Sequence, residues 1–175
     1  MVLKPEVERS EPLGFPQGYG DRVDMNIVIG SDHRGVEIKR RLVALIRSMG
    51  HEVLDVGTEG AESVDYPDFA YEVAKRVGKG EMERGLLICG TGIGMSISAN
   101  KVRGVRAAVC QDVLTAEMSR RHNDANVLCL SADLLGEDQM MQMIRIWLET
   151  PFEGGRHARR LEKIANIEAE QCKPQ

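Results

Sequence analysis

A chain of 175 residues with 42% hydrophobic residues fits a single globular domain. Its formal net charge of -4, spread over interspersed acidic and basic residues, provides no basic field of the kind that binds a nucleic-acid backbone. No stretch approaches the ~20 apolar residues that a membrane helix requires, so we expect a cytoplasmic protein with neither nucleic-acid nor membrane partners.

The N-terminal segment differs in composition from the rest of the chain. Residues 1–24 mix prolines, glycines and charges without a sustained apolar period. We interpret this segment as an extension outside the fold, either an ordered arm lying on a partner subunit or a mobile segment. Residues 25–175 then form the folded domain.

From Asn26 onward, short apolar runs alternate with longer amphipathic stretches, a pattern typical of βαβ units in a parallel sheet. The predicted strands are residues 26–30, 52–55, 85–89, 105–110 and 126–130. The predicted helices are residues 36–49, 68–77, 96–101, 113–121, 137–148 and 156–170. We therefore expect an α/β fold with an open, doubly wound, five-stranded parallel sheet and helices on both faces. Such sheets bind ligands beyond the carboxyl ends of their strands.

Polar side chains follow the first predicted strand in the run Ser31-Asp32-His33-Arg34-Gly35. Asp32 or Ser31 is a natural N-cap for the helix that follows, and capping explains the pair as well as catalysis does. Capping explains the neighbouring His33 less well. A histidine at this place could contact an anion or donate a proton.

A glycine-rich loop follows the third predicted strand and reads Cys89-Gly90-Thr91-Gly92-Ile93-Gly94-Met95-Ser96. Alternating glycines let the backbone pass close to a ligand and turn its N–H groups inward, which makes an anion cradle at a helix start. The positive end of the helix dipole stabilises a thiolate and any oxyanion nearby. Cys89 is therefore a candidate base, whereas Cys110 and Cys129 sit in apolar runs typical of small core residues.

The same glycine spacing allows a dinucleotide-binding interpretation, because Asp112 follows the next strand at about the right interval. However, the third glycine is one residue early for that motif, and little chain remains for a separate substrate domain. We therefore expect no nicotinamide cofactor. The cysteines also form no Cys-x-x-Cys pair, which disfavours a zinc site.

Two further polar clusters lie later in the chain. His122 and Asn123 precede the fifth predicted strand, where a histidine can also serve as a helix cap. Arg156 and Arg160 are four residues apart on a predicted helix and share one face. Two adjacent guanidinium groups suit a phosphate, although a solvated basic face is an equally simple interpretation.

Taken together, these motifs resemble the ribose-5-phosphate isomerase type B family, which includes the galactose-6-phosphate isomerase subunits. The resemblance runs from about residue 26 to residue 167. The motifs that carry it are Ser31-Asp32-His33, Asp65-Tyr66-Pro67, the loop from Cys89 to Ser96, Ala99-Asn100-Lys101, His122-Asn123-Asp124 and Gly154-Gly155-Arg156-His157. The resemblance implies a Rossmann-like sheet and a homodimer or tetramer whose active sites draw on two subunits. It also implies isomerisation of a sugar phosphate through an enediolate, without a metal or organic cofactor.

The resemblance further implies a role for each site residue. Cys89 would remove the C2 proton, and backbone amides of the loop would stabilise the enediolate oxygen, namely those of Gly90, Gly92, Ile93, Gly94 and Ser96. His122, with Asp32 and Thr91 nearby, would open the sugar ring. The expected phosphate ligands are His33, Arg156 and Arg160, and the expected contacts to the sugar are Tyr66, Asn100 and Asn123.

Two positions separate this sequence from other members of the family. Some relatives use a glutamate of the loop as the base, and here that position is Met95, whose thioether cannot accept the proton. Many relatives carry a phosphate-binding arginine after the fifth strand, and here that position is Asp133. The carboxylate leaves tetrose, pentose and hexose phosphates all open as substrates, and it motivates the alternative of a non-catalytic phosphosugar-binding protein.

Overall fold

The protein is described here by a computed structural model that covers residues 24–171, so nearly all of the predicted N-terminal extension lies outside the described residues. The strands are β1 (Asn26–Ser31), β2 (Glu52–Asp55), β3 (Arg84–Cys89), β4 (Ala107–Val109) and β5 (Val127–Ser131). They form one parallel sheet in the order β2-β1-β3-β5-β4. The chain thus starts near the middle of the sheet, adds β2 on one side and then reverses, which confirms the predicted doubly wound topology.

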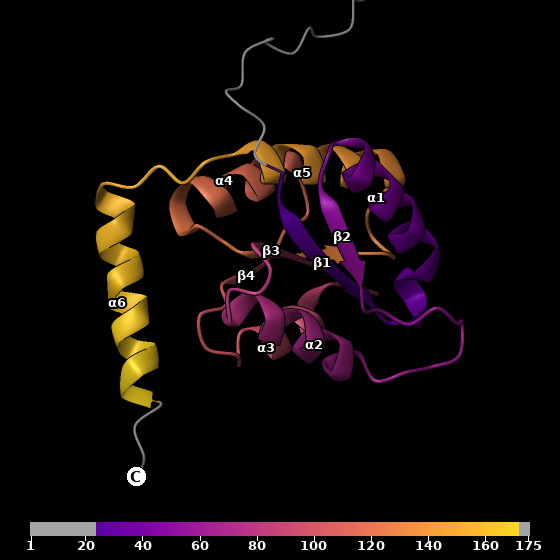
Figure 1. Ribbon diagram of the computed structural model, residues 1–175, viewed down its shortest axis with the longest axis horizontal. Coiled ribbons are helices and arrows are strands. Elements are labelled where there is room, and N and C mark those ends of the chain that lie inside the picture. The colour runs from indigo at the N-terminus through magenta and orange to yellow at the C-terminus, as the bar shows by residue number, and fades with distance from the viewer. Residues whose placement is uncertain (1–23, 172–175) are drawn as a thin grey trace, which may run out of the picture.

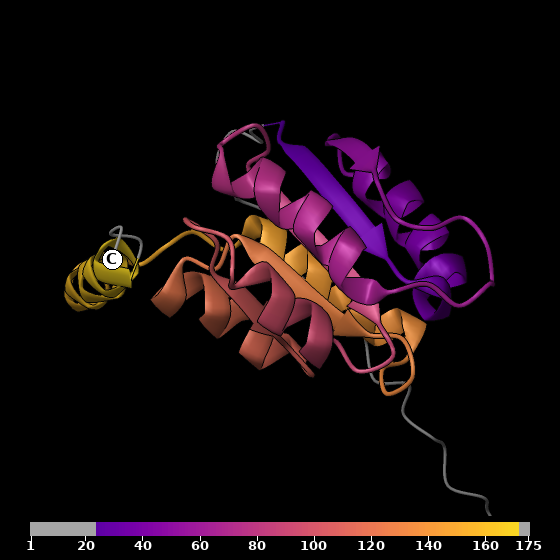
Figure 2. The same ribbon diagram turned by 90° about the horizontal axis from the view of Figure 1, so that it is seen from below.

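Helices cover both faces of this sheet, as the sequence predicts (Figures 1 and 2). One face packs against α1 (Val36–Ser48), α4 (Val113–Asn123) and α5 (Glu137–Glu149), with Trp147 fully buried among them. The other face packs against α2 (Tyr66–Gly78) and α3 (Ile93–Ala99). A short 3-10 helix, η1 (His33–Gly35), connects β1 to α1. Every crossover therefore starts at the carboxyl edge of the sheet, where the functional loops begin, and returns the chain to the amino edge.

The structure corrects several predicted boundaries, among them the following three. Helix α3 begins at Ile93 instead of residue 96, because Gly92 takes a left-handed φ of 76° and turns the chain directly into the helix. Helix α4 extends to Asn123 instead of residue 121, so His122 lies in its last turn. Strand β4 is shorter than the predicted 105–110, although Val105 and Cys110 at its two ends are still buried in the core.

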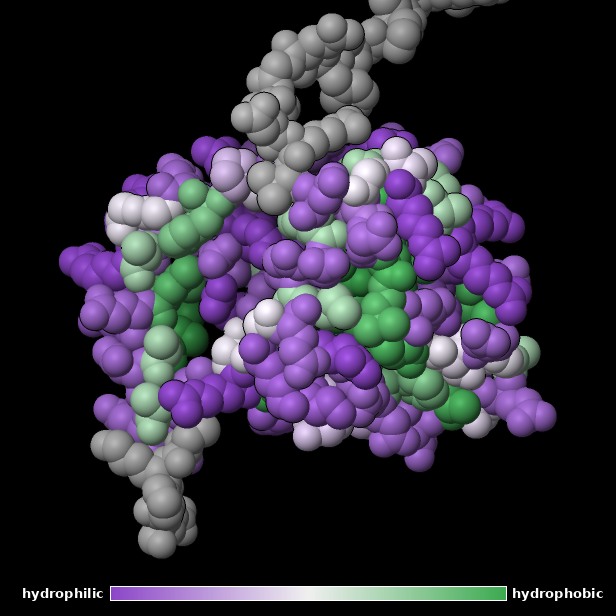
Figure 3. All heavy atoms as spheres, viewed as in Figure 1, coloured by the Kyte–Doolittle hydropathy of each residue, from purple (hydrophilic) through white to green (hydrophobic). Residues whose placement is uncertain are grey.

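Helix α6 (Arg156–Gln171) stands apart from the rest of the domain (Figures 1 and 2). Its hydrophobic side chains form a stripe that Figure 3 shows along the left of the molecule, and Ile164 and Ile167 are 48% and 60% exposed. A groove beside this helix is lined by Leu161, Ile164 and Ile167 together with residues in and around β4. Among the described helices, none has the length and hydrophobicity needed to span a membrane.

Candidate active site

The carboxyl ends of β1, β3 and β5 meet at one edge of the sheet and bring two predicted site residues together. Asp32 follows β1 and donates its backbone N–H to the carbonyl of Ile88, which precedes Cys89. Cys89 ends β3, and its carbonyl accepts the N–H of Ala132 after β5 at 2.9 Å. Cys89 and Asp32, each 5% exposed, therefore lie on neighbouring strands at the edge where this architecture binds ligands.

The conformation of the glycine-rich loop aims a backbone donor at the Cys89 sulfur. The N–H of Gly92 donates to Cys89 Sγ at 3.2 Å. A Cβ at Gly92 would lie 3.3 Å from the backbone of Leu130, so only glycine combines this φ with this close approach. The Gly92 amide therefore contacts the Cys89 sulfur at the head of the glycine-rich loop.

The first turn of α3 leaves other amides of the loop without a protein acceptor. Ile93 donates to Thr91 Oγ1 at 3.4 Å, and Ser96 donates to the Gly92 carbonyl at 3.1 Å as an ordinary helical bond. The Ser96 amide, expected in the oxyanion cradle, is thus already paired within the helix, because it lies beyond the unpaired first turn. Four loop amides have no acceptor among residues 24–171, namely those of Gly90, Thr91, Gly94 and Met95. These amides can bind an oxyanion that forms near Cys89.

Three more predicted residues surround the loop. Tyr66 lies against Gly94, where a Cβ would come within 2.6 Å of its ring. The Nδ1 atom of His33 accepts the N–H of Val64 at 3.3 Å and so ties the segment between β2 and α2 to this edge. Asp32 caps η1 by accepting the Arg34 N–H at 2.9 Å, and its other oxygen has no partner within residues 24–171. Asp32 therefore fits the predicted capping role and keeps a free oxygen for proton transfer.

The side chains of Met95, Cys110 and Cys129 point into the core instead. Met95 is fully buried, so the position where some relatives carry a glutamate does not face the site in this chain. Burial is the main cause that raises the pKa of both the Cys110 and the Cys129 thiols. The interpretation of these two cysteines as core residues is confirmed, which leaves Cys89 as the reactive candidate among the described cysteines.

His122 and Asn123 lie at the opposite edge of the sheet. Helix α4 runs antiparallel to the strands, and the Asn123 carbonyl accepts a hydrogen bond from Arg106, which precedes β4. A helix of 11 residues is about 16 Å long at ~1.5 Å per residue, so His122 is about that far from the edge that carries Cys89. Within one chain, His122 does not lie beside Asp32 and Thr91.

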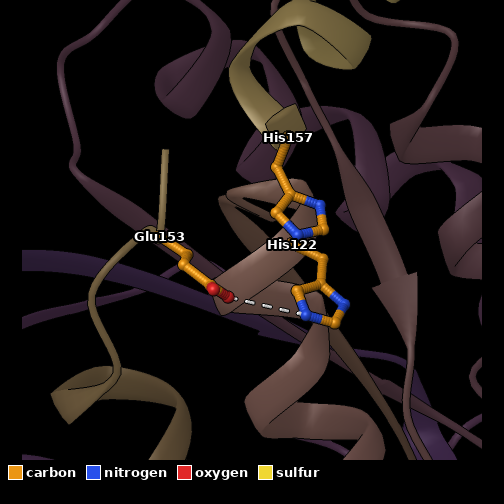
Figure 4. A group of neighbouring side chains, drawn as sticks. All are labelled: His122, Glu153 and His157. Atoms are coloured by element: carbon orange, nitrogen blue, oxygen red, sulfur yellow. Dashed lines mark ion pairs between the residues drawn. The ribbon is translucent and has the colours of Figure 1, made fainter. Parts of the chain in front are cut away.

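A histidine stack is the centre of this second cluster (Figure 4). The rings of His122 and His157 are parallel to within 6°, with centroids 4.2 Å apart, and Glu153 Oε2 lies 3.6 Å from His122 Nε2. Arg156 donates from Nε to His157 Nε2 at 3.3 Å. Burial lowers the pKa of His157, and the neighbouring His122 and Arg156 lower it further. Burial and both neighbours therefore favour the neutral form of His157.

His122, Glu153 and His157 each place a potential metal ligand within 4.8 Å of the others. The geometry does not suit a metal ion, because the lone pairs of two stacked parallel rings run side by side and do not converge on one point. His157 Nε2 also already accepts the Arg156 N–H. The arrangement therefore orients the His122 imidazole instead of forming a metal centre.

The remaining predicted ligands lie near this second cluster. Arg156 and Arg160 are exposed on the first turns of α6. Asn100 and Asn123 line the groove beside α6. The Asn100 side chain bonds both the N–H and the carbonyl of Ala107 at 2.9 Å, so much of its hydrogen-bonding capacity already holds β4 in place.

The sequence missed two residues that the structure places at these clusters. Glu153 lies in an irregular segment, where no periodic pattern points to it. Arg34 forms an ion pair with Asp133 across the glycine-rich loop, with 2.8 Å between Nη2 and Oδ1, and this pairing raises the pKa of Arg34. Asp133 and the polar run that contains Arg34 both drew attention in the sequence, but the two residues are 99 positions apart and nothing in the sequence linked them.

Comparisons with known proteins agree with the fold. The matching family model is described as Ribose/Galactose Isomerase and covers residues 27–164. The ribose-5-phosphate isomerase B of Escherichia coli is 45% identical over 142 residues, which cover 81% of this chain and 95% of that protein.

Solved structures extend this agreement to three dimensions. The structure of Clostridium thermocellum ribose-5-phosphate isomerase B has a TM-score of 0.82 at 52% identity, covering 84% of this chain and 99% of that one. The Mycoplasma genitalium ribose-5-phosphate isomerase B, solved with bound ribulose-5-phosphate, has a TM-score of 0.81 at 41% identity, covering 83% and 97%. This chain therefore belongs to the ribose/galactose isomerase family and is a sugar phosphate isomerase of the aldose-ketose type.

Proposed function

We propose that the protein interconverts ribose 5-phosphate and ribulose 5-phosphate, with Cys89 as the base that moves the proton. The observation that carries the proposal is the hydrogen bond from the Gly92 amide to Cys89 Sγ at the head of a loop with unpaired amides. The bound ribulose-5-phosphate in the Mycoplasma genitalium relative supports a five-carbon substrate. The free cysteines at 89, 110 and 129 are consistent with the reducing cytoplasm that we expect for this protein.

In the proposed proton transfer, the glycine-rich loop supplies both the base and the amides that stabilise the enediolate. The Cys89 thiolate removes the proton from C2 of the open-chain aldose, and the electron pair moves to the carbonyl oxygen at C1. The unpaired amides, among them those of Gly94 and Met95, stabilise the enediolate oxygen. The hydroxyl proton on O2 passes to O1, and the Cys89 thiol returns its proton to C1 as the carbonyl forms at C2, which gives the ketose. Ring opening comes first and uses a histidine that moves a proton between the anomeric hydroxyl and the ring oxygen.

A complete site on this account requires two copies of the chain. His122, Arg156 and Arg160 lie at the opposite edge of the sheet from Cys89, so they serve a site only when another subunit brings its carboxyl edge to them. The exposed Ile164 and Ile167 on α6 and the apolar groove beside them provide a surface for that contact. A two-fold dimer would form two such sites, because an isologous interface repeats each contact.

Proton exchange with solvent tests the proposed base directly. In heavy water the wild-type protein should introduce deuterium at C1 of ribulose 5-phosphate, as followed by NMR. Cys89→Ser should lower the rate about a hundredfold or more, in line with the loss of a general base. The control is Cys110→Ser, which changes a cysteine that is 2% exposed in the core and should keep most of the activity. Full activity in Cys89→Ser would rule out the cysteine mechanism.

The substrate is tested by a panel of aldose and ketose phosphates of four to six carbons. We expect ribose 5-phosphate to give the highest kcat/KM. Binding of these compounds without isotope exchange in any of them would favour the alternative, a phosphosugar-binding protein that lacks turnover. A higher kcat/KM for a tetrose or hexose phosphate would keep the reaction type and replace the substrate.

A further inference from the structure

Arg34 and Asp133 form an ion pair that lies on the first glycine of the loop. The Arg34 Nε and Nη2 atoms lie 3.0 and 2.8 Å from the same oxygen, Asp133 Oδ1. A Cβ at Gly90 would lie 2.8 Å from Asp133 Oδ2 and 3.2 Å from Cδ and Nε of Arg34. The pair therefore packs directly on Gly90, one residue from Cys89.

The backbone holds both members of the pair in place. The Arg34 N–H donates to Oδ1 of Asp32 at 2.9 Å, within the short helix η1. The Asp133 N–H donates to the carbonyl of Gly90 at 3.1 Å. Both side chains thus start from backbone that is bonded to the residues of the candidate site.

One edge of the Arg34 guanidinium remains open to a ligand. Asp133 occupies the edge formed by Nε and Nη2, whereas the edge formed by Nη1 and Nη2 has no second acceptor among residues 24–171. The Arg34 side chain is 54% exposed. Two N–H groups on one edge of a guanidinium match two oxygens of a phosphate.

The open edge also lies within reach of the reacting centre. Arg34 Nε is 3.2 Å from the Cβ position of Gly90. Because adjacent Cα atoms are about 3.8 Å apart, Arg34 Nε lies no more than about 11 Å from the Cys89 sulfur. A phosphorylated sugar whose C2 lies at Cys89 extends its phosphate over a distance of this order.

We propose that Arg34 binds the phosphate group of the substrate and that Asp133 is a positioning residue that holds the guanidinium over Gly90. The inference rests on the proposed function for the nature of the ligand. It also accounts for a carboxylate at position 133, because the charge of Asp133 is neutralised by Arg34 and does not face the phosphate alone. Arg34 thus supplies a cation from the same chain that carries Cys89.

Titration of the purified full-length protein with inorganic phosphate tests this proposal without any need for turnover. Arg34→Gln should weaken phosphate binding about ten- to a hundredfold, the usual effect of losing a charge-assisted hydrogen bond. The KM for ribose 5-phosphate should rise by a similar factor while kcat changes little. The matched control is Arg40→Gln, which removes another exposed arginine with a carboxylate partner, Glu37, and should leave phosphate affinity unchanged.

Asp133→Asn provides a second test with the opposite sign. The asparagine keeps the length of the side chain and an oxygen that accepts from Arg34, but it removes the negative charge. Phosphate should then bind about threefold more tightly, the effect of deleting a unit charge about 6 Å from the anion in waterlike surroundings. Calorimetry measures both constants, and thermal unfolding checks that each variant is folded.

The outcomes separate this proposal from the proposed function. Equal phosphate affinity in wild type, Arg34→Gln and Arg40→Gln would overturn the role of Arg34. Phosphate binding in an Asp133→Ala variant that is as tight as in Asp133→Asn would overturn the positioning role of Asp133, because the alanine removes the oxygen that holds Arg34. A wild-type protein that isomerises no sugar phosphate but loses phosphate affinity in Arg34→Gln would refute the proposed function and leave the anion site standing.

Discussion

Replacement of Gly92 by alanine perturbs the loop at its most constrained position. Gly92 has a φ of 76°, and its added Cβ would lie 3.3 Å from the backbone of Leu130, which cannot move aside easily. The left-handed conformation costs a non-glycine residue about 1–2 kcal/mol. With the added crowding, we expect the free energy of unfolding to fall by about 2 kcal/mol. A backbone that relaxes this strain turns the Gly92 N–H away from Cys89 Sγ, so kcat should fall about a hundredfold.

Gly104 provides the matched control for this substitution. Its φ of 78° is nearly the same as that of Gly92, but its Cβ would have only an ordinary contact of 3.4 Å with the Gly78 carbonyl. Gly104→Ala should therefore lose about 1–2 kcal/mol of stability and keep its kcat. Urea unfolding and steady-state assays of both variants measure the two effects. An unchanged kcat in Gly92→Ala would refute the role of the Gly92 amide, and so would an equal loss of kcat in both variants.

Two further predictions concern titrating groups. Iodoacetamide should modify Cys89 before Cys110 and Cys129, whose pKa values are raised by burial, and inorganic phosphate should slow that reaction. Peptide mapping measures the order, and faster labelling of Cys110 or Cys129 would contradict it. In the folded protein the pKa of His157 is lowered from 6.5. As the pH drops below about 6.5, His157 therefore binds a proton in the unfolded chain before it does so in the folded one, and the free energy of unfolding falls. Thermal unfolding between pH 5 and 8 should show this loss in wild type and a smaller one in His157→Phe, and identical profiles would exclude it.

The sheet and its helices could be predicted because their signals are local. Each strand is a short apolar run, and α1 and α5 bury one face, which imposes helical spacing on residues such as Leu42 and Ile46. The start of α3 was predicted too late, because the glycines that allow the turn at Gly92 also weaken the helical pattern after it. Boundaries set by backbone geometry leave little trace in hydrophobic spacing.

The candidate site was predictable to a different extent at its two edges. The loop after Cys89 is contiguous in sequence, so its glycines and its helix start could be interpreted together. The ion pair of Arg34 and Asp133 joins residues 99 positions apart, and no spacing rule connects them. The separation of His122 from Cys89 follows from the direction of α4 across the sheet, which becomes visible only once the strands are ordered.

The central claim is that each active site combines the carboxyl edge of one chain with the amino edge of another, and mixing two inactive variants tests it most directly. Cys89→Ala removes the base at one edge, and His122→Asn removes the ring-opening histidine at the other. In a two-fold dimer, a mixed pair has one site with both changes and one with neither. Coexpression in equal amounts should therefore restore about 25% of wild-type kcat, because half of the dimers are mixed and each has one intact site. Activity no higher than that of the separate variants would show that Cys89 and His122 act within one chain, and would contradict this account.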